Sequence, residues 1–392
     1  MQIELNESDK EGILRVLAFA AFLVFFNGYM IAPLIPTLAL EMGATNQQMG
    51  LIVPAYLIPY GISTLFYGPL CDRIGRKKVL FILLFISILT CIANAFVPNV
   101  EAFIGVRLLS GICAGGINPI SLALIGDLYP YKQLGRAMGW IFGAIAGGMS
   151  FGSTLGAWLN PFVGWKNELF LLAIANAVAL VLVIIKLKKI TDIPDKNKTF
   201  LEVFRGYREL VKNPRGGRTY TFIFFNGVFH SGVFTWLGLY LNQRYGLGDI
   251  EVGIALLGYG LPGMLLGPYI GKLADRHGRH LLIPAGFLLA SLCVYMMIPT
   301  TSVWIFAVAV TFLSFGLDMS HPLMAGIILS VDPKRRGQAM GFNAFVLFIG
   351  MGLGSLMFQL LLQKGFVWAF GVFATIQLLL AGVGLKVFQS EK

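Results

Sequence analysis

The sequence predicts an all-α membrane protein with twelve transmembrane helices in two pseudo-symmetric halves of six. Composition points to a membrane protein first: 57% of the 392 residues are hydrophobic and 12% are charged, whereas charged residues make up about a quarter of an ordinary water-soluble domain. The mean hydropathy is +0.76. In addition, long apolar runs recur along the whole chain, and one loop pattern occurs twice.

Twelve apolar runs are long enough to cross about 30 Å of hydrocarbon, which takes roughly 20 helical residues. We place them at about 13–38, 48–69, 79–98, 101–126, 137–159, 168–187, 219–242, 251–270, 281–299, 302–329, 338–362 and 366–387. Residues 1–12 are polar and lack the basic start and cleavage site of a secretory signal, so we expect the first run to be retained. These runs predict an N-terminal half over 1–187, a cytoplasmic linker over 188–218 and a C-terminal half over 219–392.

The repeated loop lies between the second and third runs and again between the eighth and ninth. Gly-Pro-Leu-Cys-Asp-Arg-Ile-Gly-Arg, which begins at Gly68, returns as Gly-Lys-Leu-Ala-Asp-Arg-His-Gly-Arg, which begins at Gly271. Other elements repeat in the same order, including Phe-Phe-Asn-Gly ending at Gly28 and again at Gly227. Two halves of one design predict a cavity between them near the membrane midplane.

Lysine and arginine residues predict the orientation. If the N-terminus is inside, most of the 30 fall in inside loops and tails, and only Lys166, Arg244 and Lys364 lie outside, as the positive-inside rule requires. We therefore expect a multi-pass protein of the inner (plasma) membrane with both termini cytoplasmic. The formal charge of +11 is explained by this topology, and no nucleic-acid partner is expected.

The first loop copy resembles the loop between helices two and three of major facilitator superfamily transporters, and the second resembles its weaker counterpart between helices eight and nine. The resemblance implies the major facilitator fold. In that family the aspartate faces a helix of the other half and the second arginine faces an acid at the end of helix four, which together help to lock the cytoplasmic side. Here those roles would fall to Asp72, Arg76 and Asp127. The expected gate residues are Gly68, Asp72, Arg73, Gly75, Arg76, Asp127, Asp275 and Arg279.

The fifth run carries Gly148, Gly152 and Gly156 at four-residue spacing, which lets a helix press closely on a neighbour. The spacing resembles the glycine motif of the twelve-helix drug:proton antiporters, in which this helix packs against helix eleven of the other half. Ser153 and Ala157 stand where that motif has a proline and a final glycine. Ordinary close packing is the alternative interpretation.

Ionisable residues at membrane depth are the candidates for proton coupling, because a charge there costs at least about 2.5–3.5 kcal/mol. Asp318 is the only acid well inside a predicted span, and His321 follows it on the same helical face. Arg107 in the fourth run resembles a family arginine motif associated with proton transfer. The alternatives are a structural or snorkelling role for Arg107 and a mutual hydrogen bond between Asp318 and His321.

By analogy with the family, the first, fourth, seventh and tenth runs would line a substrate cavity. Its candidate residues are Asn27, Tyr29, Asn118, Asn226, His230, Trp236 and Phe315. Aromatic rings with a few amides suit an amphipathic organic molecule, while helix packing is the alternative for each residue. His230, Asp318 and His321 could instead hold a divalent transition metal. Apart from that alternative, no metal or cofactor is expected, and the coupling ion is the proton.

These observations predict a proton-coupled secondary transporter that works by alternating access in the lipid bilayer, as a monomer, and exports small amphipathic organic compounds. Two alternatives use the same fold: a proton-coupled importer of a small organic acid or siderophore-like compound, and an exporter of a divalent transition metal. An enzyme is not expected, because no loop combines a nucleophile, a base and an orienting group, or carries a phosphate-binding motif.

Overall fold

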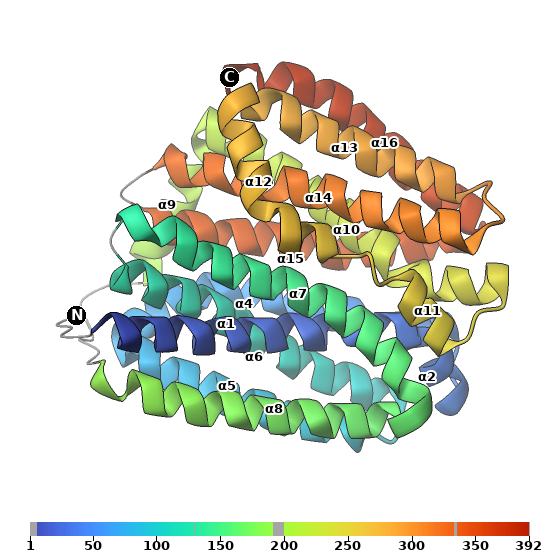
Figure 1. Cartoon of the computed structure of the whole chain (residues 1–392), viewed down its shortest axis with the longest axis horizontal. Coiled ribbons are helices and arrows are strands. Elements are labelled where there is room, and N and C mark those ends of the chain that lie inside the picture. The colour runs from blue at the N-terminus through green and yellow to red at the C-terminus, as the bar shows by residue number, and fades with distance from the viewer. Residues whose placement is uncertain (1–5, 130, 191–199, 333–334, 392) are drawn as a thin grey trace.

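The computed structural model describes residues 6–129, 131–190, 200–332 and 335–391, and these ranges form helices joined by short connections (Figure 1). The all-helical class predicted from the sequence is confirmed. Helices suit a chain this apolar, because every backbone N–H and C=O in lipid needs a partner inside the protein.

Helices from the first part of the chain lie together in the lower part of Figure 1, and we call them the N-terminal half. They are α1 (Glu7–Met30), η1 (Ala32–Leu34), α2 (Ile35–Glu41), α3 (Asn46–Gly50), α4 (Ile52–Ile74), α5 (Arg76–Ala95), α6 (Val100–Leu128), α7 (Tyr131–Val163), α8 (Trp165–Lys186) and η2 (Leu187–Lys189). The first predicted span changes direction between α1 and α2, where Pro33 and Pro36 lack the N–H groups that would continue a single helix.

The remaining helices lie in the upper part of Figure 1, except α11, which lies lower, beside the end of α7. They are α9 (Phe200–Lys212), α10 (Pro214–Tyr245), α11 (Asp249–Ala255), α12 (Leu261–His277), α13 (Arg279–Met297), α14 (Val303–Val331), α15 (Arg336–Leu362), α16 (Phe366–Val387) and η3 (Gln389–Glu391). We call α10–α16 the C-terminal half. Ten helical segments of the described chain are long and apolar enough to cross a membrane. The other two predicted spans correspond to α7 and to the α11–α12 pair.

The eighth predicted span, 251–270, is not one helix. The α-helical conformation stops at Ala255 and resumes at Leu261, and we call residues 256–260 the break. Gly260 has a φ of +87°, a left-handed conformation that glycine adopts without steric cost. Pro262, in the first turn of α12, has no N–H to donate backwards. These two residues explain why helix α11 does not run on into α12.

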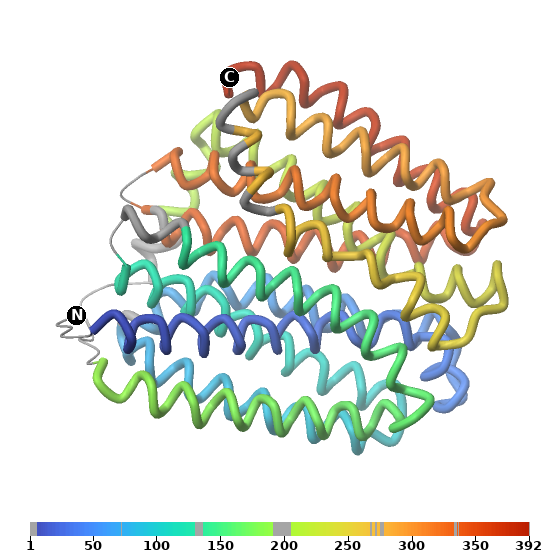
Figure 2. The backbone as a smooth tube through the Cα atoms, viewed as in Figure 1, coloured from blue at the N-terminus to red at the C-terminus, as the bar shows by residue number. Residues whose placement is uncertain are grey.

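The predicted linker contains a helix, α9, that joins the two halves. The Tyr207 hydroxyl donates to the Leu65 carbonyl of α4 over 3.2 Å, and its ring stacks on Phe342 of α15 with ring centroids 5.6 Å apart. Both chain termini and α9 lie at one end of the molecule, which we call the termini end, while α2 and α11 lie at the opposite, far end (Figures 1 and 2).

Glycines in α7 pack against α1 of the same half, which corrects the prediction of a contact with the eleventh span. A Cβ at Gly152 would lie 2.7 Å from the Phe26 carbonyl oxygen, and one at Gly156 would lie 2.8 Å from that of Met30. A Cβ at Gly148 would lie closer still to the Phe22 carbonyl oxygen. Residues four apart share one helical face, and here that face is turned toward α1.

Small residues on a neighbouring face of α7 meet the C-terminal half instead. A Cβ at Gly253 of α11 would lie 2.8 Å from the Thr154 carbonyl oxygen, and one at Gly260 would lie 2.9 Å from that of Ala146. The inter-half partner of the fifth span is therefore the eighth span. Toward the termini end, α7 and α12 diverge (Figure 1).

Candidate functional site

Tyr29 and His230 join the two halves in the middle of the molecule. The Tyr29 hydroxyl of α1 and the His230 Nε2 of α10 share a hydrogen bond of 2.9 Å. Tyr29 is buried, whereas His230 keeps some accessible surface. The sequence predicted both residues as cavity candidates, and the structure brings them into contact across the interface between the halves.

Two further aromatic rings complete this cluster. Phe234, one turn from His230 on α10, lies with its ring centroid 4.9 Å from that of Tyr29. Tyr259, in the break, lies 4.4 Å from Phe234 and 5.7 Å from His230 by ring centroids. Tyr259 is buried and its hydroxyl has no hydrogen-bond partner among the described residues. We call Tyr29, His230, Phe234 and Tyr259 the aromatic cluster.

Asp318 of α14 lies against the start of α12. Its Oδ2 accepts a hydrogen bond of 3.1 Å from the Ser314 hydroxyl, and the Gly263 backbone lies against the carboxyl group. A Cβ at Gly263 would lie 2.6 Å from the Asp318 Cγ, so only glycine leaves room for the carboxyl group. Asp318 is partly accessible and acts electrostatically on both Tyr29 and Tyr259. The carboxyl group is therefore next to the aromatic cluster.

The other two residues predicted for proton coupling have different surroundings. His321 is partly accessible, and its Nδ1 is buried without a partner among the described residues. Arg107 is fully buried; it donates to the Asn27 Oδ1 over 3.0 Å and lies over the Tyr56 ring at 4.5 Å. These Arg107 contacts stay within the N-terminal half and join α6 to α1 and α4, as expected of a structural arginine.

Several predicted cavity residues are packed elsewhere. Trp236 is fully buried near the far end, where its Nε1 donates to the Ser355 carbonyl over 3.2 Å. The Asn27 Oδ1 accepts the hydrogen bond from Arg107. Asn226 is buried with both amide atoms unpartnered among the described residues, and the Asn118 Oδ1 is likewise unpartnered. Phe315 is partly buried.

Contacts at the far end hold the halves together. The Thr37 hydroxyl of α2 donates to the Asp249 carboxylate of α11 over 2.8 Å, and the Asn160 Nδ2 of α7 donates to the same carboxylate over 2.7 Å. The Ser150 hydroxyl of α7 donates to the Leu257 carbonyl in the break over 3.3 Å. The structure is thus a conformation in which the far end is closed. These partners could not be predicted from the sequence, because the contacts join residues distant in the chain.

The predicted gate at the termini end is visible in part. Arg76 and Asp127 form the expected ion pair, and Gly75 has a φ of +100° at the turn between α4 and α5. The side chains of Asp72 and Asp275 lie outside the described residues.

The other gate positions fall on the loop and its repeat. Arg279 lies beside Gly326 of α14, whereas Gly68 is exposed and no described atom lies within 4 Å of its Cβ position. Arg73 is also exposed. Gly278, the repeat of Gly75, has a φ of +79°, so the two loop copies share the same backbone turn.

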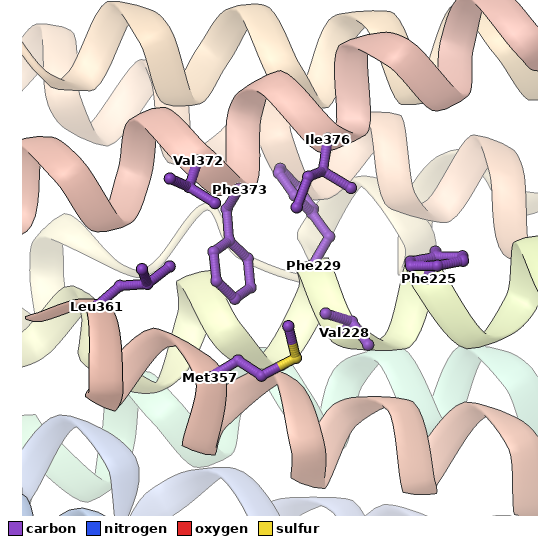
Figure 3. Close-up of a pocket in the computed structure, with 8 residues that line it drawn as sticks. All are labelled: Phe225, Val228, Phe229, Met357, Leu361, Val372, Phe373 and Ile376. Atoms are coloured by element: carbon purple, nitrogen blue, oxygen red, sulfur yellow. The ribbon is translucent and has the colours of Figure 1, made fainter.

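No metal site competes with this cluster in the described part of the chain. His230, Asp318 and His321 are not gathered into a metal-binding group, and no other three His, Cys, Asp or Glu side chains are. An apolar crevice lies between α10, α15 and α16 (Figure 3). It is lined by Phe225, Val228, Phe229, Met357, Leu361, Val372, Phe373 and Ile376. It offers no side-chain group that could bind a proton or orient a polar substrate.

The family follows from comparison of the whole chain with known proteins. The family model described as Major Facilitator Superfamily matches residues 17–255 and 248–391. The chain belongs to this superfamily. The crystal structure of the human organic anion transporter MFSD10 (TETRAN) superposes with a TM-score of 0.74 at 18% identity, covering 97% of this chain and 99% of that one. The superposition confirms the major facilitator fold, and the chain is a transporter rather than an enzyme.

Curated relatives match this transporter over nearly its whole length. Multidrug resistance protein 2 of Bacillus subtilis is 24% identical over 100% of this chain and 98% of its own. The quinolone resistance protein NorA of Staphylococcus aureus is 23% identical over 96% of both chains. The uncharacterized transporter YwfA of Bacillus subtilis is 26% identical over 96% of this chain and 91% of its own.

Proposed function

We propose that this protein is a proton-coupled transporter that exports small amphipathic organic compounds by alternating access. The observation that carries the proposal is the position of Asp318, a partly accessible carboxyl group beside the aromatic cluster where the two halves meet. Acidic residues within membrane-spanning helices are costly and characteristically mark proton or substrate pathways.

The chemistry of the cluster supports an amphipathic organic substrate. Three aromatic rings, one imidazole and one carboxyl group offer a large apolar surface with a few polar atoms to orient a ligand. Relatives whose names refer to multidrug and quinolone resistance agree with this class. The chain contributes both halves of the cluster, so a monomer suffices.

Proton coupling would follow from competition at one site. In the far-end-open state Asp318 takes up a proton from outside, and in the far-end-closed state it releases the proton toward the termini end. A substrate that binds the deprotonated site would travel the opposite way. With the termini cytoplasmic, as the lysine and arginine distribution predicts, inward proton flow would drive export from the inner membrane.

Each of the two conformations would need its own stabilising contacts between the halves. At the far end, Asp249 and its two N-terminal-half donors stabilise the closed state described above. At the termini end, the Arg76–Asp127 ion pair joins the start of α5 to the end of α6, next to the last turn of α4, which contains Asp72. Asp72 would close that end on the C-terminal half when the far end opens.

Transport by the purified protein in liposomes tests the proposal. An imposed pH gradient and an internal pH dye would be combined with tetraphenylphosphonium, norfloxacin, a small organic acid and Mn²⁺ in turn. We expect organic compounds to move protons in the antiport direction, and Asp318→Asn to abolish this while inserting normally. Symport of the organic acid would identify an importer. A response to Mn²⁺ alone, or unchanged transport by Asp318→Asn, would contradict the proposal.

A further inference from the structure

The break in the eighth span is held by a hydroxyl group that also holds Asp318. The Ser314 hydroxyl donates to the Asp318 Oδ2 over 3.1 Å and accepts a hydrogen bond of 2.8 Å from the Gly260 N–H. Ser314 and Asp318 are one helical turn apart on α14, so both side chains face α12. A single buried serine thus connects the carboxyl group to the backbone of the break.

The start of α12 needs such partners. The first N–H groups of any helix have no partner inside it, and the helix dipole places partial positive charge there. Pro262 removes one of these donors, Gly260 donates to Ser314, and the Asp318 carboxyl group lies against the Gly263 backbone in the first turn. A carboxylate at this position both accepts hydrogen bonds and opposes the dipole, and a neutral carboxyl group does so much less well.

The break also touches the parts of the protein that must move. Tyr259 precedes Gly260 and belongs to the aromatic cluster, where it packs on Phe234 and His230. Gly260 lies so close to α7 that its Cβ would be 3.0 Å from the Ser150 Cβ. A change in the backbone at Gly260 would therefore reach the aromatic cluster and the contact between the halves together.

We propose that Ser314 is a positioning residue for proton coupling, which transmits the protonation of Asp318 to the break at Gly260 and so to Tyr259 and the seal against α7. With Asp318 ionised, Ser314 and the carboxylate fix the first turn of α12. With Asp318 protonated, the cap weakens and the break loosens, so that Tyr259 and the α7 contact can rearrange; the protonated site can then pass between the far-end-open and far-end-closed states, whereas the empty ionised site is held in the closed one. This inference rests on the proposed role of Asp318 as the proton site.

The surroundings of Asp318 leave the cap as its main polar interaction. Its titratable neighbours are Tyr29 from α1 and Tyr259 from the break, with His230 of α10 beside them and His321 on α14 itself. Among the described residues, no Lys, Arg, Asp or Glu side chain forms an ion pair or hydrogen bond with its carboxyl group. Protonation would thus be felt first by Ser314 and Gly263.

Hydrogen exchange of the purified protein tests the cap directly. Peptides covering 256–264 would be compared at several pH values, after correction for the pH dependence of chemical exchange. In Ser314→Ala we expect these amides to exchange roughly 5-fold faster than in the wild type, because the Gly260 N–H loses its hydrogen-bond acceptor. Ser320→Ala is the matched control, because the Ser320 hydroxyl is buried on the same helix but bonds to the Gly316 carbonyl within α14 and to the Ile283 carbonyl of α13, not to the break or to α12.

Two more variants keep the test decisive. Ser314→Thr retains the hydroxyl and should restore protection, and Asp318→Asn should exchange quickly at every pH. In the wild type, exchange of 256–264 should rise as the pH falls, and this pH dependence should vanish in Asp318→Asn. Equal protection in Ser314→Ala, Ser320→Ala and the wild type would overturn the inference. So would a pH dependence that survives in Asp318→Asn.

A transport measurement separates a positioning role from simple destabilisation. In proteoliposomes, Ser314→Ala should shift the pH profile of transport, whereas Ser320→Ala should leave it unchanged. If Asp318→Asn transported normally, the proposed function would fail, yet fast exchange in that variant would still show that the carboxylate caps α12. If transport depended on Asp318 but hydrogen exchange of residues 256–264 did not, the inference about Ser314 and the break would be refuted, while the proposed function would stand.

Discussion

Replacing Tyr29 by phenylalanine removes the hydrogen bond that joins the two halves at the aromatic cluster. The ring and its contact with Phe234, at 4.9 Å between centroids, would remain. What is lost is the 2.9 Å bond to His230. A neutral buried hydrogen bond contributes about 0.5–1.5 kcal/mol, and leaving its partner unsatisfied costs about 1–3 kcal/mol.

Because His230 keeps some accessible surface, water can replace the lost hydroxyl, and the lower part of this range applies. A loss of about 1 kcal/mol changes a population ratio roughly fivefold. We therefore expect Tyr29→Phe to reduce the ratio of far-end-closed to far-end-open molecules about fivefold at fixed pH.

Spin labels at the far end measure this ratio. Leu40 and Ile254, on α2 and α11, are 85% and 50% exposed and could carry labels as cysteines, because the four native cysteines are buried. Double electron–electron resonance should show the longer distance gaining population in Tyr29→Phe. Tyr56→Phe is the control, because its hydroxyl donates to the Val24 carbonyl within one half. An unchanged distribution in Tyr29→Phe, or an equal change in the control, would refute the reasoning.

Two further predictions concern stability. Gly152→Val should lower the free energy of unfolding by about 1–3 kcal/mol, because a Cβ at this position would lie 2.7 Å from the Phe26 carbonyl oxygen. Gly143→Val is the control, because no described atom lies within 4 Å of the Gly143 Cβ position. In the same thermal-unfolding assay it should lower the free energy of unfolding far less. The Arg215 guanidinium holds the pKa of Glu391 below its usual 4.5. Glu391→Gln should therefore lower the melting temperature at pH 7. The difference in melting temperature between the variant and the wild type should shrink as the pH falls below about 4.5, because Glu391 of the wild type then becomes protonated. Equal effects of the two valines, or a constant difference for Glu391→Gln across pH, would contradict these accounts.

Composition and hydropathy predicted where the membrane helices lie, because lipid-crossing segments must be long and apolar whatever their tertiary partners. The internal repeat predicted the two related loops, and Gly75 and Gly278 share a left-handed turn. The Arg76–Asp127 pair was predicted by resemblance and is present. These features depend on local sequence or on a repeated pattern.

Features that depend on which faces meet were not predicted. The eighth span was predicted as one continuous helix, because residues 251–270 form one apolar run. Glycine and proline close together in the sequence are a turn signal, and this span contains Gly258, Gly260, Pro262 and Gly263. Tyr259 was missed for the same reason. The face of α7 that meets the other half was misjudged because spacing fixes which residues share a face, but not which neighbour that face meets.

Among the predicted site residues, Tyr29, His230 and Asp318 come together, whereas Trp236 and Arg107 do not join them. Large aromatic and basic residues serve packing as readily as binding, and the sequence does not distinguish the two uses. A carboxyl group in an apolar helix has fewer structural uses, which is why Asp318 was the more informative signal.

Substrate-induced proton release from the purified protein is the most direct test of the central role of Asp318. Tetraphenylphosphonium or norfloxacin, whichever is transported in liposomes, would be added to detergent-solubilised protein in weak buffer with a pH dye. The account predicts that the wild type and Ser320→Ala release protons as the substrate binds, and that Asp318→Asn binds without releasing any. Equal proton release from Asp318→Asn and the wild type would contradict the account.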